Sequence, residues 1–454
     1  MSRVRQNLLC LLTILCYLFN FSESWQACSQ EVGGGICPDL NHCCRTSTAR
    51  DSSSCISSHE QPKNGTGVCC GNHGTTGCGP NYSCSSDGRT CKLNSDAKNG
   101  LPVTLPSYQL CSLPKHSSQQ LRSMLIEPGA PQLAYYSTTD ISNNSDIRIV
   151  LIVIHGSGRN ADDYLCCGVS SVPLFMKAST LVIAPIFLTH DDGMMPTPVQ
   201  LLRWNETDPI PHTWRYGADA IHSNISSFHA IDVLIETLID HLPSVEKVII
   251  AGHSAGGQFT QRWALASGSK LWKTRGLIRV VAANPRSFCY LDQRRFLNGI
   301  FRIPNESEIA QCPGYNHWEW GLEQGGRLPT PYFDRAIEQV GGIQRIIQRY
   351  GYRDVVYVSG ELDTLRVSSE CESDHFQGPN RRARSHRFFQ SLKEIYGNNQ
   401  VYHLRLIAKG IPHDHCLIFQ SLAGQRALYG VGVRGNHSLI LDIRHHEHHS
   451  HPVA

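Results

Sequence analysis

Short aliphatic runs alternate with longer segments of mixed polarity between about residues 126 and 441. Six of these runs have the length and the β-branched content of buried strands; they begin at Ile147, Thr180, Val245, Leu277, Asp354 and Val401. The intervening segments that start at Ala230 and Gly257 instead carry apolar residues at helical spacing. Buried strands that alternate with helices predict a mostly parallel sheet covered on both faces, which is a doubly wound α/β fold.

The N-terminal part of the chain follows a different pattern. Residues 1–24 combine Arg3 and Arg5 with an apolar stretch and then small residues, which predicts a secretory signal peptide; an uncleaved anchor is the alternative. Residues 25–95 contain ten cysteines and almost no aliphatic side chains, so disulfides rather than a hydrophobic core should stabilise this module. We expect a polar linker over 96–125, the main domain over 126–441 and a His-rich tail over 442–454.

Composition and modification motifs agree with export. The net charge is +3 and 17% of residues are charged, so no field of one sign favours a nucleic-acid partner. No later run is apolar for about 18 residues, so no stable membrane span is expected. Disulfides persist in oxidising compartments, and N-glycosylation also belongs to the secretory route. Seven Asn-x-Ser/Thr acceptors support an extracellular location: Asn64, Asn81, Asn143, Asn205, Asn224, Asn305 and Asn436.

The segment Gly252-His253-Ser254-Ala255-Gly256 carries the strongest chemical signal. An aliphatic strand candidate leads directly into it and a helical pattern follows. A serine on a sharp strand-to-helix turn requires small residues two positions before and after it, so that the backbone can pass close by. This context favours Ser254 as a nucleophile over a purely structural glycine-rich turn.

With this motif in place, the chain resembles the α/β-hydrolase superfamily from about Leu133 to Leu441. Within the superfamily it looks like secreted esterases of the feruloyl-esterase and polyester-depolymerase sort. The resemblance implies that an acid and then a histidine follow the serine along the chain. Asp363 comes just after a late strand candidate, with Glu361 as the local competitor, whereas Asp354 would lie at the opposite edge of the sheet.

The base should follow the last strand, where His413 and His415 both occur. The family's Gly-x-x-His turn favours His413, and His415 is the alternative base. The oxyanion hole needs two backbone N–H groups, which the resemblance assigns to Ala255 and to Ser157 in the His155-Gly156-Ser157-Gly158 loop. A glycine turn that only redirects the chain would use the same residues.

Several further segments have two interpretations. Residues 190–228 and 312–323 could form pocket walls or a lid, or the first could be a glycosylated surface excursion. Cys312 and Cys371 flank the strand before Asp363, so we hypothesise that they pair. The run Arg381-Arg-Ala-Arg384 resembles a processing site, although an exposed basic start to a helix is favoured. Residues 73–91 resemble the last part of a granulin module.

These features predict a secreted serine hydrolase that cleaves a carboxylic ester through an acyl-serine intermediate, without a metal or another cofactor. Polymeric esters are among the expected substrates. The alternative is a non-catalytic secreted binding protein on a hydrolase scaffold, in which the Cys-rich module carries the function by binding a polysaccharide or a surface.

Overall fold

A computed structural model describes the chain from residue 121 to 441, apart from 142–145, 194, 196, 206–212, 325–329, 367–370, 398–401 and 435–437, together with the backbone of short strands between residues 25 and 93. The chain divides into two compact units, Met1–Tyr108 and Gln109–Ala454. The expected signal peptide, most of the expected linker, the His-rich tail and the disulfides of the Cys-rich module lie outside the described residues.

The described part of the first unit consists of short antiparallel strand pairs. Each strand has two to four residues, as a segment without aliphatic runs would be expected to form. The pairs are β1 (Trp25–Cys28) with β2 (Gly35–Pro38), β3 (Cys43–Cys44) with β4 (Ser54–Cys55), β5 (Val68–Cys70) with β6 (Thr76–Cys78), and β7 (Tyr82–Cys84) with β8 (Cys91–Leu93).

An eight-stranded sheet forms the centre of the second unit, in the order β20-β19-β16-β15-β11-β12-β10-β9. Pairing is parallel from β20 to β12 and antiparallel at β10 and β9. The strands are β9 (Arg122–Met124), β10 (Leu133–Ser137), β11 (Ile149–Ile154), β12 (Thr180–Ile186), β15 (Lys247–His253), β16 (Ile278–Ala283), β19 (Asp354–Gly360) and β20 (Leu404–Ala408). The sheet confirms the doubly wound prediction, and it begins at Arg122, inside the stretch expected to be linker.

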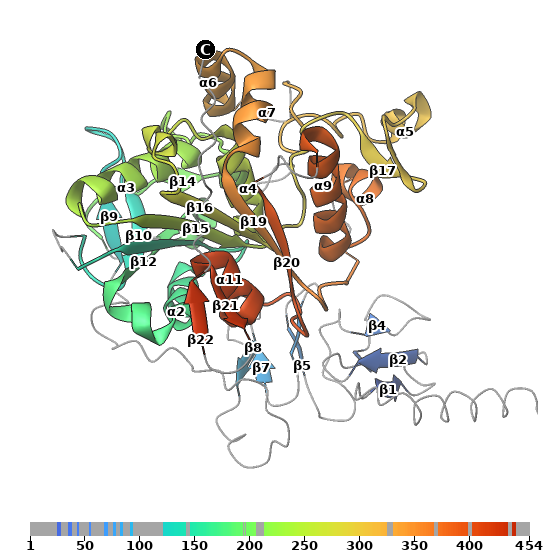
Figure 1. Ribbon diagram of the computed structural model, residues 1–454, viewed down its shortest axis with the longest axis horizontal. Helices are drawn as coiled ribbons and strands as arrows, with labels where there is room; N and C mark the ends of the chain where they lie inside the picture. Colours follow the sequence, from blue (N-terminus) through green and yellow to red (C-terminus); the bar gives the residue numbers. More distant parts are fainter. Residues whose placement is uncertain are drawn as a thin grey trace, which may run out of the picture. The chain divides into compact units, whose positions relative to one another are not determined.

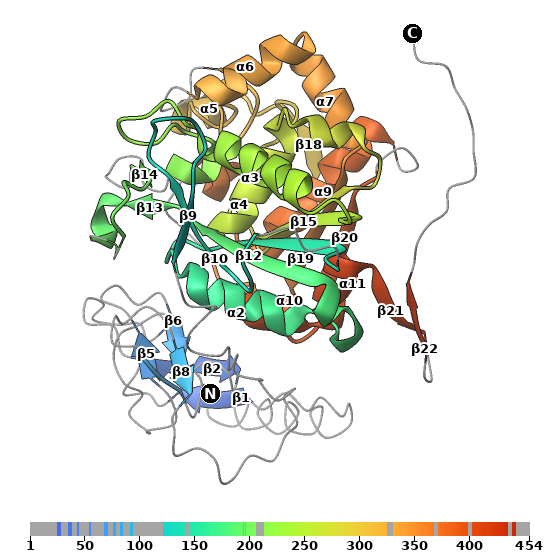
Figure 2. The same cartoon turned by 90° about the vertical axis from the view of Figure 1, so that its left-hand side faces the viewer.

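Helices cover both faces of this sheet (Figures 1 and 2). One face packs against α3 (Ser227–His241), α4 (Ala255–Ala266), α6 (Pro331–Val340), α7 (Ile343–Gly351) and α9 (Arg381–Tyr396). The other face packs against α2 (Ala161–Ser171), α10 (His415–Gln420) and α11 (Leu422–Tyr429). The central strands are therefore buried on both faces, which explains their continuous aliphatic runs.

The remaining elements are short. They are α5 (Glu306–Gln311), α8 (Cys371–Phe376), the 3-10 helices η2 (Leu174–Ser179), η3 (His190–Asp192), η4 (Thr213–Tyr216) and η5 (Lys270–Lys273), and the strand pairs β13 (Leu188–Thr189) with β14 (Arg203–Trp204), β17 (Arg295–Leu297) with β18 (Ile300–Arg302), and β21 (Val431–Arg434) with β22 (Ser438–Leu441).

The two segments that were candidates for a lid or pocket walls bury their tryptophans in the core. Trp204 and Trp214 are 0% exposed, and Trp214 stacks on Phe187 with ring centroids 5.0 Å apart. Trp318 and Trp320 are also buried. The apolar surface of these indole rings therefore stabilises the hydrophobic core and is not available to a substrate.

Two predictions about cysteines and surface groups can be compared with the structure. Cys312 and Cys371 form a disulfide, as hypothesised, with their Cα atoms 5.9 Å apart. Cys289 is a free thiol in the described part of the chain, and burial raises its pKa to about 12. Asn224 and Asn305 are exposed and Asn205 is partly exposed, whereas Asn64, Asn81, Asn143 and Asn436 lie outside the description.

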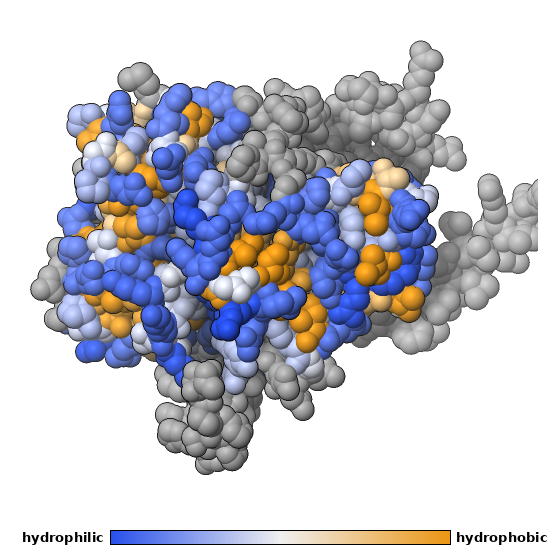
Figure 3. Space-filling view, turned by 90° about the horizontal axis from the view of Figure 1, so that it is seen from above, coloured by the Kyte–Doolittle hydropathy of each residue, from blue (hydrophilic) through white to orange (hydrophobic). Residues whose placement is uncertain are grey.

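On the face drawn in Figure 3, hydrophobic side chains form separate small patches between polar ones. Within the ranges described above, no helix has the length and apolar character that crossing a bilayer requires.

Candidate active site

Ser254 occupies a strained turn between β15 and α4. Its φ of 58° and ψ of −116° lie in a region that residues with a side chain rarely adopt. The turn is tight, since a Cβ atom on Gly252 would lie 2.2 Å from the carbonyl oxygen of Gly256. A Cβ atom on Gly256 would lie 2.2 Å from the carbonyl oxygen of Ile154. Ser254 is partly exposed between buried neighbours, which presents its hydroxyl at the C-terminal edge of the sheet.

Asp363 and His413 meet at the same edge. Asp363 follows β19 and His413 lies in the turn between β20 and α10, and His413 Nδ1 donates to Asp363 Oδ2 over 2.8 Å. The His413 ring packs on His253, the residue before Ser254, with ring centroids 4.4 Å apart. The three predicted residues therefore gather at the ends of three separate elements.

Two competing carboxylates have other partners. Glu361 accepts hydrogen bonds from Lys409 Nζ at 2.8 Å and from the N–H of Gly410 at 3.0 Å. Asp354, at the N-terminal end of β19, binds Arg279 Nε at 2.9 Å. Only Asp363, of these three, faces the histidine.

The electrostatic surroundings favour an ionised acid and a neutral base. Burial alone would raise the pKa of Asp363, but the charges of His413 and Arg381 and the hydrogen bond from His413 outweigh it, so the pKa is lowered. Burial lowers the pKa of His413, and the positive charge of Arg381 lowers it further against the opposing effect of Asp363. A neutral imidazole beside a carboxylate is the state that accepts a proton from a serine.

The architecture follows from a mostly parallel eight-stranded sheet with Ser254 on the turn between β15 and α4, Asp363 after β19 and His413 after β20. This is the α/β-hydrolase fold. It agrees with the expectation from the sequence, although the position of the first strand differs.

Comparison with known proteins gives remote structural matches. The chain is similar to poly(aspartic acid) hydrolase-1 from Sphingomonas sp. KT-1, at 21% identity over 68% of this chain and 98% of that one, with a TM-score of 0.44. It is also similar to LpqC, a poly(3-hydroxybutyrate) depolymerase from Bordetella parapertussis, at 18% identity, 67% and 86% coverage and a TM-score of 0.44. The siderophore hydrolase EstB from Aspergillus nidulans matches at 13% identity, 75% and 100% coverage and a TM-score of 0.35. No family model and no curated protein sequence matches the chain.

Ala255 and Ser157, which the sequence analysis expects to form the oxyanion hole, lie in two neighbouring segments. Ala255 is the first residue of α4, so the helix itself offers no acceptor for its N–H. On the other side, a Cβ atom on Gly156 would lie 3.7 Å from Ser254 Cβ, which places the loop after β11 beside the nucleophile. Ser157, the next residue, is exposed.

His155 orients this loop. Its Nε2 accepts a hydrogen bond from the N–H of Phe187 at 2.9 Å, so Nδ1 carries the proton and donates to the carbonyl of Gly156 at 2.8 Å. The C=O and N–H of a trans peptide point in opposite directions. Anchoring the Gly156 carbonyl therefore turns the N–H of Ser157 away from His155.

An ion pair that the sequence did not indicate holds the same loop from outside. Arg159 Nε lies 3.0 and 2.7 Å from the two carboxylate oxygens of Asp192 in η3, and Arg159 Nη1 donates to the carbonyl of Ser157 at 3.3 Å. Arg159 has a positive φ of 55°, an uncommon backbone conformation next to a functional turn. Its partner lies 33 residues away, beyond the reach of a local pattern.

His253 is another positioning group that sequence analysis missed. Asn284 Nδ2 donates to His253 Nε2 at 3.3 Å, so Nδ1 carries the proton and binds Tyr164 Oη at 3.2 Å. Burial lowers the pKa of His253 well below its usual value, followed by the charges of His413, His415 and Arg381, which keeps the ring neutral. The residue before the nucleophile is thus fixed from two sides.

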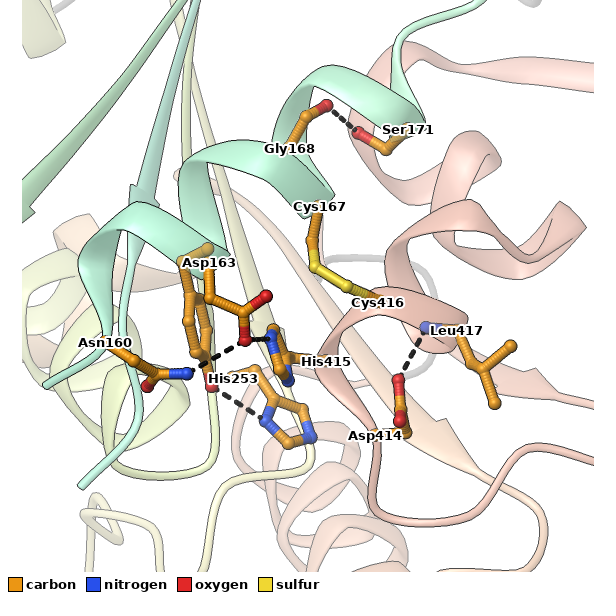
Figure 4. The surroundings of a disulfide bond; sticks show 11 residues. Asn160, Asp163, Cys167, Gly168, Ser171, His253, Asp414, His415, Cys416 and Leu417 are labelled. Carbon is orange, nitrogen blue, oxygen red and sulfur yellow. Dashed lines mark hydrogen bonds and ion pairs between the residues drawn. A yellow bond between two sulfur atoms is a disulfide. The ribbon is translucent and has the colours of Figure 1, made fainter. Parts of the chain in front are cut away.

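His415, the alternative base, has a different partner (Figure 4). Its Nε2 lies 2.9 Å from Asp163 Oδ2, and its ring stacks on Tyr164 with centroids 4.1 Å apart. Burial would lower the pKa of His415, but Asp163 reverses this effect and the pKa is raised. The next residue, Cys416, forms a disulfide with Cys167 of α2. His415 therefore ties α10 to α2, while His413 faces the acid.

Two groups of side chains have the residue types of metal ligands. They are Asp163, Cys167, His415 and Cys416, and Cys312, Cys371 and Glu372. In both groups the cysteines are joined to each other. Because the metal ligand is a thiolate, neither group offers a cysteine ligand while its disulfide is intact.

Proposed function

We propose that the protein is a secreted serine hydrolase that cleaves a carboxylic ester through an acyl-serine intermediate. The observation that carries the proposal is the contact between His413 Nδ1 and Asp363 Oδ2 at 2.8 Å, beside a serine on a strained strand-to-helix turn. A buried carboxylate, a neutral imidazole and a partly exposed serine at one edge of the sheet have the roles of acid, base and nucleophile.

In the first half of the reaction, Ser254 Oγ attacks the carbonyl carbon of the ester while His413 Nε2 accepts its proton. The imidazolium that forms is stabilised by Asp363, which stays ionised. The N–H groups of Ala255 and Ser157 stabilise the oxyanion of the tetrahedral intermediate. The ester C–O bond then breaks, and His413 returns the proton to the leaving alcohol.

The second half uses the same groups with water as the nucleophile. His413 takes a proton from water, and the hydroxide attacks the acyl carbon of the acyl-serine. The bond from that carbon to Ser254 Oγ breaks and His413 protonates the serine. A carboxylic acid is released and the enzyme returns to its starting state without a cofactor.

Secretion is part of the proposal. The support is the signal-like segment at residues 1–24, the disulfides of the second unit, and acceptor asparagines that are exposed at Asn224 and Asn305. Expression with the native N-terminus should deliver a processed, N-glycosylated protein to the medium, which mass spectrometry before and after deglycosylation would measure. Retention of residues 1–24 on a cell-bound product would contradict this part.

The catalytic part is tested with p-nitrophenyl esters of increasing acyl length and a fluorophosphonate probe that labels activated serines. We expect turnover of at least one ester and labelling of the wild-type protein. In Ser254→Ala both should disappear, because loss of a triad nucleophile costs about 10³-fold or more. Removing a partly exposed hydroxyl should leave the fold intact, which thermal unfolding would measure.

The same experiment separates the alternative function. A folded wild-type protein that neither hydrolyses the esters nor reacts with the probe would be a non-catalytic binding protein on a hydrolase scaffold. Polysaccharide binding by the full chain would then point to the Cys-rich module as its functional part.

A further inference from the structure

One oxygen of the Asp363 carboxylate, Oδ1, lies near the guanidinium of an arginine. Asp363 is fully buried, with a side chain that is 0% exposed, and its Oδ2 accepts the hydrogen bond from His413. Its Oδ1 lies 3.5 Å from Arg381 Nη1, at the first residue of α9. The carboxylate therefore stands between the imidazole and a guanidinium.

The second carboxylate oxygen depends on that guanidinium. Asp363 Oδ1 has no hydrogen-bond partner among the described groups. The nearest backbone donors of the loop are engaged elsewhere: the N–H of Leu362 donates to Ile411 and the N–H of Asp363 donates to Gly360. A buried carboxylate oxygen without a hydrogen bond is costly unless a positive charge compensates it. Arg381 supplies this charge.

The arginines of the basic run at the start of α9 have different partners. The run Arg381–Arg384 was expected to be the exposed start of a helix, and this is wrong for Arg384, which is 0% exposed and paired with Asp374 at 2.6 Å. The side chain of Arg381 is 16% exposed. Arg382 Nη1 instead donates to the backbone carbonyl of Glu361 at 2.9 Å. Each arginine has its own partner, and only the first one faces the active-site acid.

We propose that Arg381 is a positioning residue of the active site: its guanidinium holds Asp363 Oδ1, so that the other carboxylate oxygen is directed at His413. The inference rests on the proposed function, since it concerns the same serine, acid and base. Arg381 acts through Asp363 and His413.

The charged and titratable groups around His413 set the direction of the effect. They are Asp363 after β19, Arg381 on α9 with Arg286 and Arg384 near it, His253 at the end of β15, Asp414 on the same loop and His415 at the start of α10. After burial, Arg381 is the largest influence that lowers the pKa of His413, and it also lowers the pKa of Asp363.

The charge of Arg381 affects the pH dependence of activity through both His413 and Asp363. His413 accepts the serine proton only when it is neutral, so activity falls as the pH drops through its pKa. Removing the positive charge of Arg381 raises the pKa of His413 and also that of Asp363. Both changes move the acid limb of the kcat/KM profile to higher pH.

The test compares full-length Arg381→Gln, Arg381→Lys and the neighbouring control Arg382→Gln. The control removes an arginine one residue away and keeps the backbone N–H of residue 382. The measurements are kcat/KM for a p-nitrophenyl ester between pH 5 and pH 9, fluorophosphonate labelling at pH 8, and thermal unfolding.

For Arg381→Gln we expect the acid limb of the kcat/KM profile at higher pH. The loss of kcat/KM relative to wild type should be about 10-fold larger at pH 5.5 than at pH 8. Arg381→Lys should restore most of the wild-type profile, and Arg382→Gln should match the wild type. An Arg381→Gln profile that keeps the wild-type limb overturns the inference. The inference is also overturned if Arg381→Gln loses the same factor of kcat/KM at every pH and Arg381→Lys does not restore it. That result would indicate that Arg381 has a structural role only.

The outcomes also separate this inference from the proposed function. A wild-type protein that labels and turns over, with an unchanged pH limb in Arg381→Gln, removes the role of Arg381 and leaves the hydrolase. A folded wild-type protein without labelling or turnover removes the hydrolase, and the positioning role with it.

Discussion

Replacing Gly256 with alanine should displace the nucleophile turn from the loop after β11. A Cβ atom at this position would lie 2.2 Å from the carbonyl oxygen of Ile154 and 2.6 Å from that of His155. Both are backbone atoms, so no side-chain rotation relieves the contact. To reach the ~3.3 Å of a close C···O contact, the two segments must separate by about 1 Å.

That displacement affects catalysis because the two segments carry the two expected oxyanion donors, Ala255 and Ser157. A misplacement of about 1 Å costs on the order of 10²-fold in rate. Overpacking of this kind also destabilises a protein by about 1–3 kcal/mol. In an unconstrained helix the same change would stabilise by about 1 kcal/mol, because alanine is the better helix former. Close backbone approach therefore predicts that Gly256→Ala lowers the stability, whereas helix propensity alone predicts that it raises the stability.

The assay measures kcat, KM and the midpoint of thermal unfolding for Gly256→Ala and for Gly268→Ala. Gly268 is the matched control, since a Cβ atom there would approach only the flexible end of Gln339, at 3.3 Å. We expect a large loss of kcat with a lower melting temperature in the first variant and near wild-type values in the second. Higher stability together with wild-type kcat in Gly256→Ala would refute the argument from close backbone approach.

Three further predictions concern the base, the acid and a disulfide. His413→Ala should lose most activity, whereas His415→Ala should keep much of it, because only His413 faces Asp363; kinetics with the reverse result would exchange their roles. Asp363→Asn should slow turnover by about 10⁴-fold, and combining it with Ser254→Ala should add little; additive losses would mean that the residues act separately. Joint Cys167→Ser and Cys416→Ser substitution should destabilise by at most about 5 kcal/mol, given a separation of 249 residues, and unfolding at the wild-type denaturant midpoint would argue against this bond.

The sequence alone predicted the fold class and the nucleophile turn, because both depend on local patterns. Aliphatic runs that are buried on both faces, and helices with one apolar side, are properties of single segments. The turn around Ser254 also lies within one strand–turn–helix unit, so Gly252 and Gly256 indicated the close approach before the structure located it. The strained φ of Ser254 agrees with that reasoning.

Only the tertiary structure shows which carboxylate His413 and His415 each reach. The two residues are two positions apart and share the same local sequence, so no periodicity distinguishes them. Their difference lies in the carboxylate that each one reaches: Asp363 is 50 residues from His413, and Asp163 is 252 residues from His415. The resemblance to a family favoured the first, and packing of α10 against α2 explains the second.

Tertiary packing likewise determined which polar and aromatic residues are buried. Arg381 and Arg384 have the composition of an exposed basic run, and Trp204 and Trp214 that of a surface segment with an N-glycosylation acceptor. Arg384, Trp204 and Trp214 are buried and Arg381 is partly buried, because a partner from another segment lies against each one: Asp374, the aromatic side chains around Phe187, or Asp363. A hydrophobic pattern predicts which side chains of one segment face the core and which face solvent. It does not report which distant segment will supply the charge or the ring, since that depends on the packing of the whole domain.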